Sequence, residues 1–341
     1  MSLMKIATGA GMAVIILLAI LVIYITTKPS LIVKSIEVTD IVTSKIEGPF
    51  WVSHCPGIKI FFKTDKYPVK FYLLTSEGKV IDSYKAELPE EVAYLAINEI
   101  CENIVGPKKY VVKAFIDDEE VLRREINVKG VSGSIRILNT SISVITHMLG
   151  NIKEKEPKID KILIEVENTG DVPLYLACPL FNPVVLSVDG NPLFFTPSKE
   201  AIMPGSRERV ELSIFGGVDP DERHVFTISV SGIENAPYIT EPLRPEVRID
   251  EVKLGYENFS RSWFMENITI TIRNTEAYPI GLHHLEMYAN DKFFLPFVRG
   301  FVNPGEEKTV TVGGTFYVKE KPSEIKIKLY GTEVVYRISE G

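Results

Sequence analysis

Apolar and polar residues alternate along most of the chain, in short runs that are typical of β-strands with one buried face. Residues 58–63 and 69–74 are two such runs, rich in β-branched and aromatic side chains. Residues 110–116 and 121–128 flank the acidic turn 117–120, a pattern that predicts a β-hairpin. The alternation therefore predicts a mainly β protein.

Residues 89–106 depart from this alternation. Their apolar positions recur at helical spacing, after Pro89 and two glutamates and before a Gly-Pro pair. The positions are Val92, Leu95, Ala96, Ile100 and Ile104. We predict that this segment is one amphipathic helix, packed on the first β-sandwich of the chain.

Residues 6–25 contain no charge, and eleven of these twenty positions are Ile, Leu or Val. A helix of this length rises about 30 Å, which matches the hydrocarbon core of a bilayer. A cleaved secretory signal is the alternative, but the run is longer than the roughly 7 to 15 residues of a typical signal core, and no small-residue cleavage site follows. We therefore predict an N-terminal membrane anchor over residues 1–29.

Two later parts of the chain repeat each other, each with a strand that ends at an asparagine. A proline follows five residues on, and then come a hairpin turn and a Pro-Gly pair before the next strand. The first copy has Asn168, Pro173, Asp189-Gly190 and Pro204-Gly205, and the second has Asn274, Pro279, Asn290-Asp291 and Pro304-Gly305. The asparagine turns the backbone by side-chain hydrogen bonding, and the hairpin and Pro-Gly turns need residues that accept positive φ. These markers are structural and imply no chemistry.

The residues beyond the anchor, roughly 310, are more than one hydrophobic core usually organises. Together with the repeat, this number predicts three tandem immunoglobulin-like β-sandwiches. We place the first, with its helix, at residues 30–130, the second at 131–243 and the third at 244–341.

The order of these markers over residues 132–338 resembles the water-stress and hypersensitive-response domain, also called the type 2 late embryogenesis abundant (LEA) fold. The third domain carries the resemblance best, through Asn274, Pro279, Ile280, Leu282, Leu285, Asn290 and Pro304-Gly305. The Asn-Pro-Asn of that family is absent, because Thr275 and Glu276 follow Asn274. The markers also resemble adhesion-type immunoglobulin-like repeats of bacterial and archaeal surface proteins. Either resemblance implies a β-sandwich of about 100 residues without a catalytic site.

The composition limits the function classes. The formal net charge of −7 lacks the basic excess that a nucleic-acid surface needs. Glutamine is absent, whereas lysine and glutamate are plentiful, a composition typical of proteins from very hot habitats. We therefore interpret the chain as an archaeal, thermophile protein of the cell surface.

Three cysteines and three N-glycosylation sequons are candidate modification sites. Cys55 and Cys101 fall in one predicted domain and either form a disulfide, worth about 4 kcal/mol, or remain two buried thiols. Cys178 is interpreted as a small core residue. The sequons begin at Asn139, Asn258 and Asn267.

No motif for known catalytic chemistry is present: the chain lacks a Gly-x-Ser-x-Gly, a His-Glu-x-x-His and a phosphate-binding loop. His283 and His284 are adjacent, and adjacent residues of a strand face opposite sides, so we do not expect them to share a metal. We expect no catalytic, cofactor or metal site and predict that the protein is not an enzyme.

Aromatic pairs recur at matching places in the two repeats, Phe194-Phe195 and Phe293-Phe294. In a strand, one ring of each pair faces the core and the other faces out. The outward rings are candidates for contact with a partner, and burial against a neighbouring domain is the alternative.

These features predict a single-pass protein of the cell membrane, with most of the chain extracytoplasmic. Its orientation is open, because Lys5 and the amino terminus on one side balance Lys28 and Lys34 on the other. We expect a structural or protein-interaction role, with the membrane contacted through residues 6–25 and with other surface proteins or a second copy as partners. The alternatives are an accessory subunit of a membrane enzyme or transporter, a stress-protection protein, and a filament subunit that donates the strand at 31–38 to a neighbour.

Overall fold

A computed structural model describes residues 30–43, 53–98, 102–149, 152–178, 183–313 and 317–338. Within these residues the chain forms antiparallel β-sheets arranged in tandem along the sequence, and its one helical element is a three-residue 3-10 turn. The chain divides into two compact units. Unit 1 is Met1–Ser132 with Asn168–Phe181 and Met203–Ser206, and unit 2 is Gly133–Glu167, Asn182–Ile202 and Arg207–Gly341.

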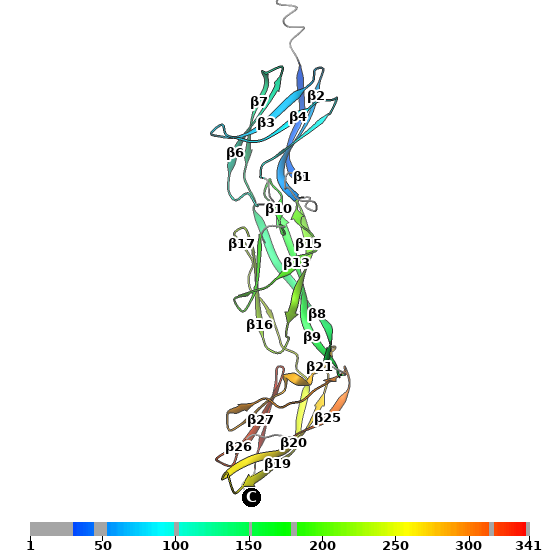
Figure 1. Ribbon diagram of the computed structural model, residues 1–341, viewed down its shortest axis with the longest axis vertical. Coiled ribbons are helices and arrows are strands. Elements are labelled where there is room, and N and C mark those ends of the chain that lie inside the picture. The colour runs from blue at the N-terminus through cyan, green and yellow to red at the C-terminus, as the bar shows by residue number, and fades with distance from the viewer. Residues whose placement is uncertain are drawn as a thin grey trace, which may run out of the picture. The chain divides into compact units, whose positions relative to one another are not determined.

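The first two sheets lie in unit 1 (Figure 1). One has the strand order β1-β2-β5 and the other has the order β4-β3-β6-β7. Their strands are β1 (Leu31–Thr43), β2 (Ser53–Thr64), β3 (Val69–Thr75), β4 (Val80–Ala86), β5 (Val92–Ala96), β6 (Lys108–Ile116) and β7 (Glu119–Val128).

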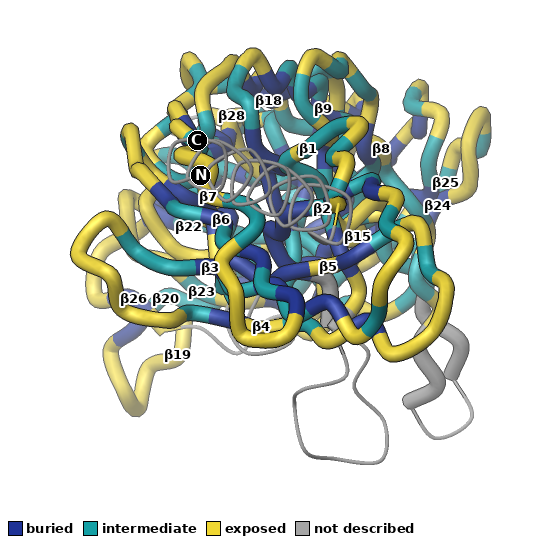
Figure 2. The backbone as a smooth tube through the Cα atoms, turned by 90° about the horizontal axis from the view of Figure 1, so that it is seen from above, coloured by how far each residue is buried: buried dark blue, intermediate teal, exposed yellow. Residues whose placement is uncertain are grey.

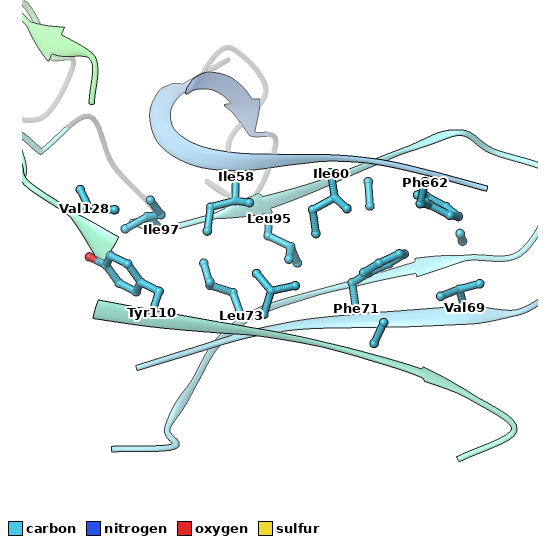
Figure 3. Packing of buried hydrophobic residues seen from close by; sticks show 14 of the residues in the cluster. Ile58, Ile60, Phe62, Val69, Phe71, Leu73, Leu95, Ile97, Tyr110 and Val128 are labelled. Carbon is cyan, nitrogen blue, oxygen red and sulfur yellow. The ribbon is translucent and has the colours of Figure 1, made fainter. Parts of the chain in front are cut away.

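A hydrophobic core fills the space between these two sheets, because both have alternating apolar side chains on the facing sides. Ile58, Ile60 and Phe62 on β2 face Phe71 and Leu73 on β3 (Figure 3). All five are fully buried, and the rings of Phe62 and Phe71 are in contact, with centroids 4.9 Å apart.

The next group of strands again forms two main antiparallel sheets. One has the order β13-β15-β9-β8, the other has the order β12-β11-β16-β17 with β18 also on β16, and β10 and β14 form a small pair. Their strands are β8 (Gly133–Leu149), β9 (Ile152–Asn168), β10 (Leu174–Tyr175), β11 (Val184–Val188), β12 (Asn191–Pro192), β13 (Phe195–Pro197), β14 (Ala201–Ile202), β15 (Arg207–Val218), β16 (His224–Val230), β17 (Ile233–Glu234) and β18 (Tyr238–Thr240).

The last sheets lie entirely in unit 2. Their orders are β19-β20-β25, with β26 also on β20, then β23-β22-β27-β28 and the pair β21-β24. Their elements are β19 (Glu246–Glu257), β20 (Ser262–Arg273), β21 (Ile280–Gly281), the 3-10 helix η1 (Leu282–His284), β22 (Glu286–Ala289), β23 (Lys292–Phe294), β24 (Phe301–Val302), β25 (Glu307–Val312), β26 (Tyr317–Val318), β27 (Glu324–Leu329) and β28 (Thr332–Arg337). Along the chain, buried strand segments alternate with exposed turns (Figure 2).

The predicted amphipathic helix is wrong. Residues 92–96 form β5, which pairs antiparallel with β2, so that Ala93 lies opposite Ile60 and Leu95 opposite Ile58. Ala93, Leu95 and Ile97 are buried in alternation, a period of two that is hidden among the apolar positions at helical spacing. Pairing with β2 and burial in the core therefore override the local helical pattern.

The predicted fold class also included a membrane-spanning helix. No helix among the described residues is long and apolar enough to span a membrane. The predicted spanning helix at residues 6–25 lies outside the described residues. What the structure has is an all-β architecture of tandem sheets. The three-domain division at residues 130 and 243 stays a prediction.

The predicted turn chemistry is confirmed. Asp189 and Gly190 have φ values of 50° and 81°, and Asn290 and Asp291 have 42° and 63°. Positive φ at both central residues is the conformation that a two-residue hairpin with a type I′ turn requires. Gly205, at the Pro-Gly turn of the first repeat, has a φ of 71°.

Candidate functional site

The adjacent histidines His283 and His284 lie close together instead of facing opposite ways. The expectation that they point to opposite sides is wrong because they belong to η1 rather than to a strand. Their ring centroids are 4.1 Å apart, and the His284 ring is 4.8 Å from that of Tyr330. A 3-10 turn rotates successive side chains by about 120°, so it allows this approach.

Carboxylates surround the two rings. Glu156 on β9 places Oε1 3.1 Å from His283 Nε2. Asp219 and Asp221, from the loop between β15 and β16, lie 3.7 Å from His284 Nε2 and Nδ1 respectively. All of these residues belong to unit 2. We call Glu156, Asp219, Asp221, His224, His283 and His284 the histidine–carboxylate cluster.

The loop that carries Asp219 and Asp221 is fixed by its own contacts. Lys158 on β9 donates to Asp219 Oδ1 at 2.6 Å. His224, the first residue of β16, has Nδ1 2.7 Å from Asp189 Oδ2 and Nε2 2.7 Å from the carbonyl oxygen of Asp219. The carboxylates therefore face η1 in a defined position.

His224 is buried and the other members of the cluster are partly buried, and the pKa values of His284 and His224 shift in opposite directions. Burial and the neighbouring His283 lower the pKa of His284. Burial is the largest single influence on His224 and acts to lower its pKa, but the hydrogen bonds to Asp189 and to the Asp219 carbonyl oxygen, with the charges of Asp189 and Asp221, together raise the pKa. The pKa of Lys158 is likewise raised against its burial, by Asp219 and Glu156. Two histidines of one cluster thus respond oppositely to acid.

A polar cavity of about 300 Å³ opens beside these residues. It is lined by Asp221, Glu222, His283, His284, Glu286, Leu295, Lys328 and Tyr330. Among the described residues, no group of three or more His, Cys, Asp or Glu side chains is placed to hold a metal ion. What this arrangement can do chemically is bind and release protons.

The aromatic pairs have one buried and one more exposed ring each. Phe194 is 83% exposed, whereas Phe195 is 8% exposed. Phe293 is 56% exposed, whereas Phe294 packs against the core of the last sheets. The alternation expected for these pairs is therefore confirmed, and a partner for the exposed rings stays a prediction.

Phe194 has an aromatic neighbour that the sequence pattern did not indicate. Its carbonyl oxygen accepts the amide of Phe215 on β15 at 2.9 Å, which places the two residues opposite each other on paired strands. Phe215 is 68% exposed. Opposite residues of an antiparallel pair project from the same face, so both rings present apolar surface to solvent.

The three candidate sequons differ in accessibility. Asn139 on β8 and Asn258, in the turn between β19 and β20, are exposed. Asn267 is half-buried within β20, the strand that pairs with both β19 and β25, and its Oδ1 is buried without a hydrogen bond. Accessibility alone therefore favours Asn139 and Asn258, and modification of any of them stays a prediction.

The two described cysteines differ in their chemical state. Cys55 is a buried thiol that packs with Ile41 and Ala96. Cys178 is disulfide-bonded, although it was interpreted as a small core residue. Cys101, the partner predicted for Cys55, lies outside the described residues. Of the two alternatives left open for Cys55, the structure has the thiol.

Most of the cluster was missed by sequence reasoning. Glu156, Asp219 and Asp221 carry no motif and are separated by tens of residues from His283 and His284. The signals that could have found the site are the His-His pair itself and the acidic run before His224. Only the fold brings them together.

Comparisons with known proteins give no family, because no family model and no curated protein matches the chain. Among solved structures, one match is the crystal structure of a protein of unknown function from Porphyromonas gingivalis W83. It is 12% identical, with 62% of this chain and 99% of that chain covered and a TM-score of 0.18. Another is a structure titled "Biofilm associated protein - BSP domain", 8% identical, with 89% and 65% covered and a TM-score of 0.16. At these TM-scores neither likeness carries an argument.

Proposed function

We propose that this chain is a non-catalytic protein-interaction or structural protein of the cell surface, which contacts partners through the exposed rings of its two repeats. The observation that carries the proposal is the matched exposure of Phe194 and Phe293, each beside a more buried phenylalanine. An exposed phenylalanine leaves apolar surface in water, and covering it on binding is favourable by about 25 cal/mol per Å².

The recurrence separates these rings from isolated exposed apolar residues, which are common on any surface. They occupy corresponding places 99 residues apart (293 minus 194). Phe215 enlarges the first patch, and Leu295 and Phe297, 66% and 83% exposed, follow the second along the chain. A partner with repeated apolar contacts fits such a surface, and adhesion-type repeats, which the marker order resembles, engage other surface proteins or further copies of themselves.

The proposed location rests on the sequence. The uncharged residues 6–25 suit contact with a membrane, and the exposed sequons at Asn139 and Asn258 suit an extracytoplasmic position. The chain carries no motif for catalysis. We therefore place most of the chain outside the cytoplasm, as part of the cell envelope.

Strand donation to a neighbouring copy is a weaker alternative. β1 pairs with β2 of the same chain along its length, from Leu31 opposite Thr64 to Thr43 opposite Ser53. Donation would first have to break this ladder, whereas the phenylalanine surfaces are accessible without any rearrangement. We therefore base the proposal on surface contact.

Protease shaving of intact cells tests the location. We expect the chain to be cut at the same protease concentration as known surface proteins, with a cytoplasmic protein protected as control. Survival of the chain under those conditions would overturn the proposed location, because an extracytoplasmic domain has no membrane between itself and the protease.

Site-specific photo-crosslinking in intact cells tests the contact. A photoreactive residue at position 194 or 293 should give a discrete adduct, whose mass assigns it to a second copy or to another surface protein. The matched control is position 259, because Phe259 is 99% exposed but lies in the hairpin turn between β19 and β20. Equal adducts at all three positions, or none at 194 and 293, would contradict the proposed binding surface.

A further inference from the structure

The histidine–carboxylate cluster joins β9, the loop at residues 219–223 and η1, all within unit 2. We propose that it is an acid-sensitive latch: at neutral pH it holds the β8–β9 hairpin against the last sheets, and protonation of His284 releases this contact. The inference is independent of the proposed partner surface.

The geometry around His284 favours the neutral ring. Its Nε2 is buried and has no hydrogen-bond partner. The nearest carboxylate oxygens, from Asp219 and Asp221, are 3.7 Å from its nitrogens, which is beyond hydrogen-bond reach. Asp219 already accepts the Lys158 ammonium at 2.6 Å. A proton added to the closed site would therefore be buried without a direct acceptor.

Charges reach His284 from each element packed around it. The groups are Glu156 and Lys158 on β9, Asp219, Asp221 and Glu222 in the loop, His224 on β16, His283 on η1, Glu286 on β22, and Lys328 and Tyr330 at the end of β27. Asp219 and Asp221 favour a charged His284, whereas Lys158, His283 and burial oppose it. The net result is a lowered pKa of His284, so burial, His283 and Lys158 together outweigh the two carboxylates.

The sign of the pH effect follows from this lowered pKa. In an opened site the ring is hydrated and its pKa returns to about 6.5, the ordinary value for histidine. The open form then binds the proton more tightly than the closed form, so the closed form is favoured fully above that value and loses stability as the pH falls below it. The opening equilibrium shifts about tenfold for each unit by which the two pKa values differ.

The other two histidines of the cluster must be distinguished from His284. The pKa of His224 is raised, so acid strengthens its contact with Asp189, but this contact lies within the second group of sheets and does not cross to η1. His283 has Nε2 3.1 Å from Glu156 Oε1 and so forms part of the contact across the junction. The latch is therefore assigned to His284, and its test must separate the three rings.

The contacts that would be released lie between β8, β9 and the last sheets. Across the junction, Glu156 meets His283, the Lys155 ammonium lies over the Phe301 ring at 4.9 Å, and Ile142 on β8 packs against the core of the last sheets. Local opening of a junction between two groups of sheets costs less than global unfolding. Loss of one favourable protonation state can therefore change its population measurably.

Hydrogen exchange of the full chain, followed by mass spectrometry at pH 7.5 and pH 5.0, tests the latch. After correction for intrinsic rates, peptides that cover η1 and residues 152–160 should exchange about threefold faster or more at pH 5.0. Peptides that cover β10 in unit 1 are the internal control and should not change. His284→Gln keeps a polar side chain without the titration and should remove the response, whereas His283→Gln should keep it.

A wild-type response that is absent, or that persists unchanged in His284→Gln, would overturn the latch. Opening caused by a chelator at pH 7.5 would also overturn it, because a metal ion and not a neutral histidine would then hold the junction. If His284→Gln does not fold, the wild-type histidine signals in an NMR pH titration decide: we expect one ring to protonate below the ordinary range, together with the opening, and the absence of such a ring contradicts the proposal.

Discussion

The turn that follows the strand-ending asparagine occurs twice, and different side chains hold its two copies in place. In unit 1 the turn after Asn168 is seated among residues of the first sheets, and we call this the first joint. In unit 2 the turn after Asn274 leads into η1 and the histidine–carboxylate cluster, the second joint. The hydrogen bonds around the asparagine are the same in both copies, whereas the residues that contact the turn differ.

The shared part is a hydrogen-bond network around a fully buried asparagine. The amides of Gly205 and Gly305 donate to the carbonyl oxygens of Asn168 and Asn274, both at 2.8 Å. Each side-chain amide donates to the carbonyl oxygen four residues on, also at 2.8 Å. Each side-chain oxygen accepts the amide two residues on. The asparagine amide thus uses both its donor and its acceptor groups although it is buried.

The first joint is completed by groups that do not titrate near neutral pH. Asn103 accepts the amide of Tyr175 at 2.7 Å and donates to its carbonyl oxygen at 3.0 Å. Val172 is part of the first core. Cys178, in the same segment, is disulfide-bonded. The second joint instead uses histidines and carboxylates. The difference teaches that the same turn can pack against uncharged groups in one copy and against ionisable groups in the other, depending on the surface it meets.

The largest expected effects are at the shared asparagines. Asn274→Ala should lower the free energy of unfolding of unit 2 by about 3 to 4 kcal/mol, because it leaves two buried carbonyl oxygens and one amide without their partner. Asn168→Ala should act similarly on unit 1. Hydrogen exchange in increasing urea reports each unit separately. Asn191→Ala, at an exposed position, is the control and should change stability by less than about 0.5 kcal/mol. A change confined to the other unit would contradict the network.

Breaking the disulfide should distinguish the joints. Cys178→Ser should lower the stability of unit 1 by about 3 kcal/mol and leave unit 2 unchanged. A reductant should reproduce this effect in the wild type and have no further effect in the variant. Cys55→Ala is the matched control, because its thiol lies outside the disulfide and reductant sensitivity should persist. If a reductant lowered the stability of both units equally, the disulfide would not distinguish the first joint from the second.

The smallest effects concern the acidic residue of each turn. The Asp171 carboxylate accepts the amides of Lys129 and Gly130 at 2.8 to 3.0 Å, whereas the Glu276 carboxylate accepts the amide of Arg244 at 2.7 Å. Asp171→Asn should therefore cost unit 1 about 1 to 2 kcal/mol, and Glu276→Gln should cost unit 2 about half as much. Urea unfolding of both variants measures the ratio. A larger loss for Glu276→Gln would show that the single bond is the stronger one.

Much of the strand pattern could be predicted, because it depends on alternation and on turn residues. The hairpin at Asp189-Gly190 and the Pro-Gly turn at Gly205 have the predicted positive φ. The helix predicted at residues 89–106 failed because several apolar positions fit both a helical and a strand period, and pairing with β2 decides between the two. Local pattern cannot weigh a pairing partner that lies 30 or more residues away.

The candidate site could be predicted only in fragments. The exposed Phe194 and Phe293 follow from strand alternation, but the contribution of Phe215 depends on which strands pair. His283 and His284 are visible as a pair, yet the expectation that they diverge assumed a strand. Hydrogen bonding within η1, where Leu285 donates its amide to Leu282, produced the turn that brings both rings to one side.

The sequence by itself determined that the chain is mainly β and fixed the turn chemistry, because these depend on side-chain alternation and on which residues accept a given φ. Only the tertiary structure decided which side chains hold the turn of each repeat. Glu156 and Asp219 are 63 residues apart (219 minus 156), and neither lies near a histidine of η1 until strand pairing and packing place η1 beside them. Proton affinity depends on burial and on neighbouring charge, and both arise from the fold.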